Sequence, residues 1–132
     1  MNLPTIDVKL HAVRRAYRAG ELLSGEYSIQ PAPGQEVRAV ELSVLWFTEG
    51  KGDEDFGVHF FERHGGHDEG FEVGTPWRLE TTLPNTPLSY EGIILKIRWC
   101  VRVRVFLGRG REFFVEVPFQ LGGVPQPALV AT

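Results

Sequence analysis

The sequence predicts an all-β protein, folded as an antiparallel sandwich of seven to eight strands. Apolar and polar residues alternate with a period of two wherever the sequence is regular, as they do in strands that are buried on one face. The chain also has 15 glycines and 9 prolines, which implies many turns and disfavours a helical bundle. Its 132 residues fit one domain, which we expect to extend over residues 1–122.

The first four predicted strands are 6–10, 23–29, 40–47 and 56–62. Each has one apolar row, which we expect to face inward, and a more polar opposite row. The inward rows of the first three are Ile6, Val8 and Leu10, then Leu23, Gly25, Tyr27 and Ile29, then Val40, Leu42, Val44 and Trp46. Gly25 is expected to let a neighbouring backbone approach closely, because it has no side chain.

The last three predicted strands are 77–83, 93–107 and 113–121, of which the second is the clearest. Its inward row is Ile93, Leu95, Ile97, Trp99, Val101, Val103 and Val105. A helix would scatter the arginines of this segment among the valines, whereas a strand separates them cleanly. Gly108-Arg109-Gly110 predicts a hairpin turn before the last strand, where outward-facing Pro118 indicates an edge position or a strand end. All three tryptophans fall on inward rows and are predicted to pack in the core.

Composition excludes several classes of protein. The chain has 14 Lys and Arg against 17 Asp and Glu, so a general nucleic-acid binder is not expected. A single cysteine excludes a disulfide framework and a cysteine-rich zinc module. The sequence has neither an apolar stretch of about 20 residues nor an export signal, so we expect a cytoplasmic protein. Residues 123–132 lack periodicity and are expected to form a flexible tail.

Two motifs resemble those of arrestin-type domains. Residues 17–25, Tyr-Arg-Ala-Gly-Glu-Leu-Leu-Ser-Gly, are similar to the opening pattern Y-R-x-G-E-x-x-x-G of that family, and residues 37–42 are similar to its next strand. Residues 83–92, Leu-Pro-Asn-Thr-Pro-Leu-Ser-Tyr-Glu-Gly, resemble the family's segment L-P-x-x-x-x-S-Y-x-G. The long strand that follows also resembles its counterpart, so the similarity extends from about Ile6 to Leu121.

The resemblance implies an immunoglobulin-like sandwich and an adaptor function. Relatives include arrestins, arrestin-domain-containing proteins and bacterial sporulation-control proteins, which bind receptor tails, cargo or other proteins. Most relatives carry two such lobes, whereas this chain has the length of one, so mechanisms that depend on lobe rotation are not transferred. We therefore expect a protein-interaction module without enzymatic activity or cofactor, which binds a partner segment at a sheet edge or on a basic face. Tyr90 is expected to pack its ring beneath the sandwich edge with its hydroxyl bonded.

The region from residue 96 to residue 111 is strongly basic and contains no acidic residue. Its six cations are Lys96, Arg98, Arg102, Arg104, Arg109 and Arg111. Alternation places the first four on one strand face, with like-facing neighbours ~7 Å apart. Such a row fits an acidic peptide, a phosphate-bearing partner or, as a peripheral contact, an anionic membrane surface. It also fits a solvated face paired with acids on neighbouring strands, and the sequence leaves both interpretations open.

An acidic counterpart extends from residue 51 to residue 72, with seven acidic residues against two cations. The contrast in charge means that the two segments can meet, either within one molecule or between two copies of the chain. Self-association is therefore kept as a second kind of partner contact.

A cluster of histidines raises an alternative function, a small-ligand or metal-binding domain that uses the loop His64–Glu69. His64, His67 and Asp68 lie close together, but their spacing matches no standard zinc motif, and no metal site is predicted. His59 alternates with apolar neighbours and is interpreted as an ordinary strand residue. Cys100 is placed on the polar side of a regular strand, where nothing activates its thiol, so no catalytic residue is predicted.

Overall fold

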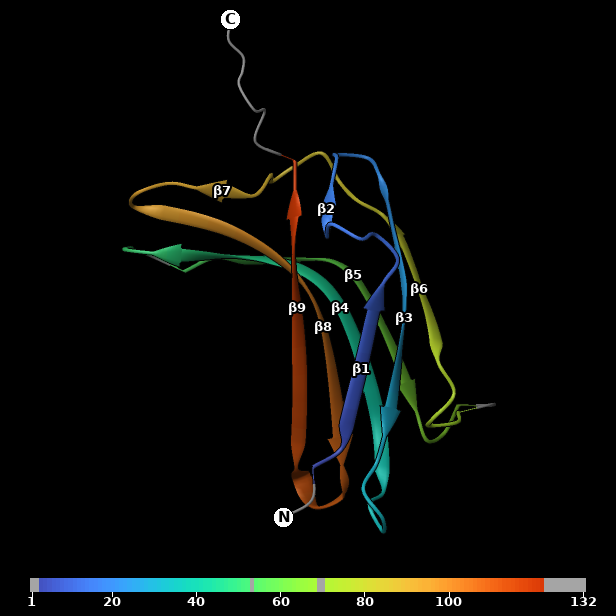
Figure 1. The fold of residues 1–132 in the computed structure, drawn as a ribbon. Helices are drawn as coiled ribbons and strands as arrows, with labels where there is room; N and C mark the ends of the chain where they lie inside the picture. Colours follow the sequence, from blue (N-terminus) through green and yellow to red (C-terminus); the bar gives the residue numbers. More distant parts are fainter. Residues whose placement is uncertain (1–2, 53, 69–70, 123–132) are drawn as a thin grey trace, which may run out of the picture.

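Two β-sheets pack face to face in this protein (Figure 1). A computed structural model describes residues 3–52, 54–68 and 71–122, so the predicted tail lies outside the described residues. The smaller sheet has the strand order β1-β3-β6, and the larger has the order β2-β9-β8-β4-β5, with β7 paired to one end of β8. The predicted all-β sandwich is confirmed.

The described residues form nine strands, joined between β8 and β9 by a short 3-10 turn. In chain order the elements are β1 Thr5–Leu10, β2 Ala16–Tyr17, β3 Leu22–Gln30, β4 Val37–Gly50, β5 Phe56–Gly65, β6 Trp77–Thr82, β7 Tyr90–Glu91, β8 Leu95–Leu107, the turn Gly108–Gly110 and β9 Glu112–Leu121. Seven of these strands correspond to the seven predicted ones. The other two, β2 and β7, have two residues each and are too short for an alternating pattern to reveal. Pairing is antiparallel except between β2 and β9, which are parallel.

The core lies between the two sheets and is built from the predicted inward rows. Its buried members include Leu23, Tyr27 and Ile29 of β3, Val40, Leu42 and Val44 of β4, and Trp99, Val101, Val103 and Val105 of β8. The indole N–H of Trp99 donates a 2.8 Å hydrogen bond to the Pro87 carbonyl, which satisfies its one polar group. Trp46 and Trp77 are only partly buried and pack against the margin of this core.

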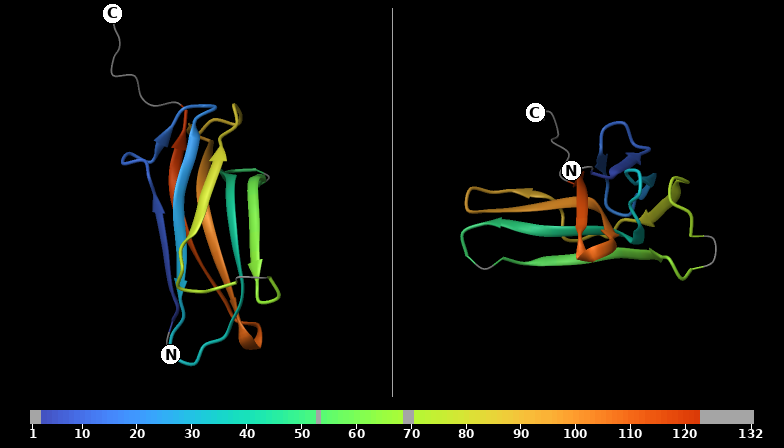
Figure 2. Two further views of the ribbon diagram at one scale, coloured as in Figure 1. Left: turned by 90° about the vertical axis from the view of Figure 1, so that its right-hand side faces the viewer. Right: turned by 90° about the horizontal axis from the view of Figure 1, so that it is seen from below.

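The larger sheet extends beyond the smaller one as an arm, made of the end of β4, the start of β5, the start of β8 and the whole of β7 (Figures 1 and 2). Because no second layer covers the arm, two predictions are wrong there. Strand β8 begins at Leu95, and Ile93 and Ile94 are exposed in the turn before it, where Gly92 N–H donates to the Leu95 carbonyl. Tyr90 is also exposed instead of packing beneath the sandwich edge.

Cys100 faces outward as predicted, but its side chain is buried. It lies opposite Leu45 of β4 and Pro118 of β9, and Arg98 and Arg102 flank it on the same face of β8. Two apolar neighbours and two long arginine stems exclude water from the thiol. This burial raises the pKa of the Cys100 thiol to about 12, and the Glu116 carboxylate contributes in the same direction.

We expect the Cys100 thiol of the folded protein to react very slowly with Ellman's reagent at pH 8. At a pH well below the raised pKa, the group is almost entirely a protonated thiol, and only the thiolate is the nucleophile. Unfolding in guanidinium chloride is expected to release one reactive thiol per chain. Reaction of the folded protein as fast as a free thiol would contradict the buried position.

Replacing Gly25 by alanine is expected to destabilise the fold by about 1–3 kcal/mol. Gly25 lies opposite Leu10 of β1, and a Cβ at this position would meet the Lys9 carbonyl oxygen and lie 3.1 Å from the Leu10 Cα. The predicted close approach of two backbones is therefore present. Urea unfolding measures the effect, and Ser28→Ala, on the opposite face of the same strand, is the control. Equal stability of the two variants would show that β1 shifts without cost.

Candidate functional site

The predicted basic row lies on the outer face of β8, and each of its four cations is paired with a carboxylate. The ion pairs are Lys96–Glu91 at 3.5 Å, Arg98–Glu49 at 2.6 Å, Arg98–Glu91 at 3.3 Å, Arg102–Glu116 at 2.5 Å and Arg104–Glu112 at 3.8 Å. The acids come from β4, β7 and β9, the strands that adjoin β8. An incoming acidic partner would compete with these contacts. Binding by this row stays a prediction.

The carboxylates that pair with the row do not come from the acidic segment 51–72. They belong to positions 49, 91, 112 and 116, outside that segment. Among the described residues, no ion pair joins the acidic segment to the basic one. Contact between the two segments of different copies stays a prediction.

The remaining two predicted cations, Arg109 and Arg111, border a recess of about 700 Å³ at one end of the molecule. Arg38 and Glu36 line the same recess. These positions meet because Val37 at the start of β4 pairs with Leu107 at the end of β8, so the flanking loops lie at the same end of the sheet. Sequence reasoning missed Arg38, because only the register between the two strands brings it to the turn.

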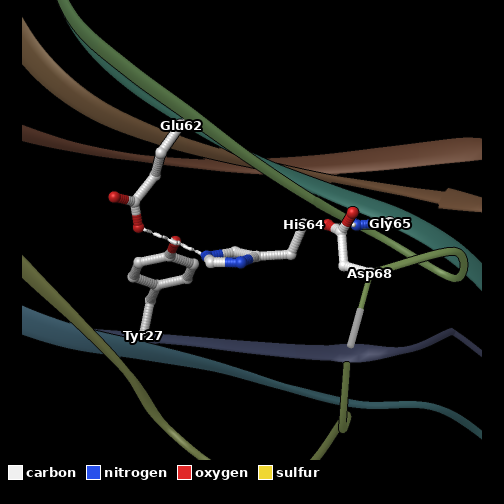
Figure 3. Close-up of polar contacts among 5 residues, drawn as sticks. All are labelled: Tyr27, Glu62, His64, Gly65 and Asp68. Atoms are coloured by element: carbon white, nitrogen blue, oxygen red, sulfur yellow. Dashed lines mark hydrogen bonds and ion pairs between the residues drawn. The ribbon is translucent and has the colours of Figure 1, made fainter. Parts of the chain in front are cut away.

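A second polar group connects the two sheets where the sandwich is open, between β5 and β6 (Figure 3). The Tyr27 hydroxyl of β3 donates to the Glu62 carboxylate of β5 and lies 2.9 Å from His64 Nε2. The His64 ring stacks on Trp77 of β6, with ring centroids 4.6 Å apart and planes 8° from parallel. Burial, and then the bond to Glu62, raises the pKa of Tyr27, so its hydroxyl remains a donor at neutral pH.

Sequence reasoning missed this group because it placed His64 in a loop. Strand β5 continues to Gly65, which makes His64 a strand residue whose side chain, like that of Glu62, faces the smaller sheet. Finding this group from the sequence would have required the predicted strand 56–62 to extend to His64. It would also have required the pairing of β3 with β6.

His59 is a strand residue of β5, as predicted. Its Nε2 lies 2.7 Å from the Thr82 carbonyl oxygen and 3.2 Å from Thr81 Oγ1, so it also connects β5 to β6. In the loop that follows β5, the Asp68 carboxylate accepts a 2.8 Å hydrogen bond from Gly65 N–H (Figure 3). Glu69 lies outside the described residues. The part of the chain that is described holds no group of three or more His, Cys, Asp or Glu side chains suited to a metal ion.

Strand β5 forms one edge of the larger sheet and, among the described strands, pairs only with β4. Its outer face carries Phe56, Val58 and Phe61, which are 69%, 52% and 51% exposed. A register shift keeps these three on one face, because Val44 pairs with Phe60 and Leu45 pairs with Val58. The strand contains neither lysine nor proline, the residues that commonly block strand addition at an edge.

The structure is similar to the crystal structure of Spo0M, a sporulation control protein from Bacillus subtilis, with a TM-score of 0.65 and 18% sequence identity. The match covers 92% of this chain and 50% of the Spo0M chain, so this chain spans half the length of that protein. The chain has the arrestin-like fold. The resemblance read from the two motifs is therefore confirmed at the level of the fold. No protein-family model and no curated protein matches the sequence.

The described part of the chain has no helix that is long and apolar enough to cross a membrane.

Replacing Tyr27 by phenylalanine is expected to lower the free energy of unfolding by about 1–3 kcal/mol. The change removes the hydroxyl that donates to the partly buried Glu62 carboxylate and leaves that carboxylate with one fewer partner. Tyr90→Phe, at an exposed position, is the matched control and should leave stability unchanged. Urea unfolding at pH 7 measures both variants. Equal stability of Tyr27→Phe and wild type would mean that the polar connection between the sheets contributes nothing.

Proposed function

We propose that this domain is a protein-interaction module that binds an extended segment of a partner protein along the edge of β5. The observation that carries the proposal is the row of Phe56, Val58 and Phe61 on a strand whose second edge has no backbone partner among the described residues. A segment added at this edge gains backbone hydrogen bonds from β5. Side chains on its outer face would lie beside the apolar row and lose water there.

The row also defines the chemistry of the partner segment. Phe56 pairs with Phe47 and Val58 with Leu45, so the apolar surface continues from β5 onto β4. At the other end, Arg63 forms an ion pair with Glu41, which limits the apolar stretch. The complementary segment is about six residues long, with an apolar side chain at every second position.

The edge is favoured over the arginine row as the binding surface. Each row cation already has a carboxylate within 4 Å, so an acidic partner would have to replace existing ion pairs. The apolar row of β5 requires no such exchange, because its exposed side chains contact water. The similarity to Spo0M, which is described as a sporulation control protein, supports a regulatory role through the shared fold.

Replacing Phe61 by lysine is expected to abolish partner capture without unfolding the domain, because the new charge would be desolvated by an added strand. The matched control is Phe114→Lys, which alters a 56% exposed phenylalanine on the outer face of β9. Tagged proteins are incubated with native cell extract, and retained proteins are quantified by mass spectrometry. A partner is expected to bind wild type and Phe114→Lys at both low and high salt and to be absent from Phe61→Lys.

Equal retention of the partner by Phe61→Lys and wild type would contradict binding at the edge of β5. Loss at high salt, together with loss in the triple variant Arg98→Glu, Arg102→Glu, Arg104→Glu, would assign binding to the arginine row instead. Thermal melts of each variant show that a loss of binding is not a loss of fold.

A further inference from the structure

We propose that the recess bordered by Arg38, Arg109 and Arg111 binds a small phosphate-bearing molecule. This proposal is independent of the protein-interaction function, because the recess is lined by residues of the β3–β4 loop and the β8–β9 turn. The loop and the turn lie at the same end of the sandwich (Figure 1). None of the residues that carry the apolar row of β5 lines it.

The backbone fixes the position of the recess. Leu107 N–H donates to the Arg111 carbonyl at 2.8 Å and closes the turn, and Gly108 N–H donates to the Glu36 carbonyl at 3.2 Å and joins the turn to the loop. The side chains of Glu36 and Arg38 lie over Gly108, where a Cβ would be 3.4 Å from Glu36 Oε1 and 3.9 Å from Arg38 Nε. The three arginines therefore converge from two separate parts of the sequence onto one concave surface.

Positive charge in the recess is not balanced within the described residues. Arg38 lies 3.7 Å from Glu36, and both side chains are largely exposed. Neither Arg109 nor Arg111 forms an ion pair with a described residue, in contrast to every cation of the row on β8. Three guanidinium groups against one carboxylate leave two positive charges, which a doubly charged phosphate would neutralise. Planar guanidinium groups also match pairs of phosphate oxygens.

The backbone of Arg109 supports a role for its side chain. Its φ of 66° and ψ of 28° lie in the left-handed region, which glycine adopts freely and arginine adopts at a cost. Glycines flank it on both sides, and Gly110 has a similar φ of 72°. Arg15, outside the recess, also has a positive φ of 53°, so this conformation supports the proposal only together with the convergence of the three arginines.

The lining selects among phosphate-bearing ligands. Its described members include no aromatic side chain on which a nucleotide base can stack, and the Glu36 carboxylate is able to accept hydrogen bonds from hydroxyl groups of a ligand. A volume of about 700 Å³ is within the range of small-molecule sites. The concave shape, the Glu36 carboxylate and the formal net charge of -3 disfavour a flat anionic membrane. A compact, hydroxylated phosphate ester fits these features best.

Pyrophosphate titration followed by ¹H–¹⁵N NMR tests the site. Saturable shifts are expected for the amides of residues 34–38 and 108–111. The double variant Arg109→Gln, Arg111→Gln should weaken binding by at least about tenfold, since it removes two charge-assisted contacts. The matched control, Arg98→Gln with Arg102→Gln, removes the same charge from the paired row and should change the affinity by less than about twofold. Arg109→Gly should weaken binding without lowering Tm, because glycine relieves the left-handed backbone.

The proposal would be overturned by shifts that map elsewhere, by equal weakening in the two double variants, or by undiminished binding in Arg109→Gly. A lipid surface is tested by co-sedimentation with phosphatidylcholine vesicles that contain phosphatidylserine. Binding to these vesicles that is lost in the double variant Arg109→Gln, Arg111→Gln, without any shifts from pyrophosphate, would assign the recess to a lipid surface. That result would overturn the small-ligand assignment. Phe61→Lys should bind pyrophosphate like wild type, so failure of the edge proposal and failure of this one are separable.

Discussion

Burial of the inner row of β8 between the two sheets determines where the other features of this molecule lie. Trp99, Val101, Val103 and Val105 lose almost all contact with water, and each contributes about 1.5–3 kcal/mol or more by its burial. The side chains between them must then point outward, which places the arginines on the opposite face. Because β8 lies between β4 and β9, the same burial sets which acids lie beside those arginines. Core packing and surface charge are thus two consequences of one alternating strand.

On the open side of the sandwich, β5 and β6 are not joined by backbone hydrogen bonds of a β-ladder. Side chains, and not a strand ladder, connect β5 to the smaller sheet: His59 contacts Thr82, and Glu62 and His64 contact Tyr27. These contacts hold the inner face of β5, while its outer edge pairs with no other strand in the described part of the chain. Soluble proteins commonly block an exposed apolar edge with lysine or proline, and β5 contains neither.

Sequence patterns predicted the faces of the strands well and the extent of the layers poorly. Period-two alternation identified the inward row of β8, but the predicted row extended to Ile93, which is exposed. An alternating pattern shows which face of a strand is apolar, and it does not show whether a second sheet covers that face. Tyr90 was misplaced for the same reason, since it lies on the uncovered arm. Arg38 and the contact of Tyr27 with His64 depend on which strands are neighbours and in what register, and no local pattern contains that information. The resemblance of two motifs, in their order along the chain, predicted the arrestin-like fold, which is confirmed.

The six cations of the basic segment end in two electrostatic environments, and the reason is geometric. A residue within β8 has cross-strand neighbours on both sides, so an acid on either flanking strand can reach it, as Glu116 directly opposite Arg102 does. A residue in the turn after β8 has no such neighbours, because both flanking strands have ended or turned. Arg109 and Arg111 therefore form no ion pair with a described residue, and the loop before β4 lines the same recess. One run of basic sequence thus yields a neutralised face and a charged recess, and of these two surfaces the recess is the one on which an external anion meets little internal competition.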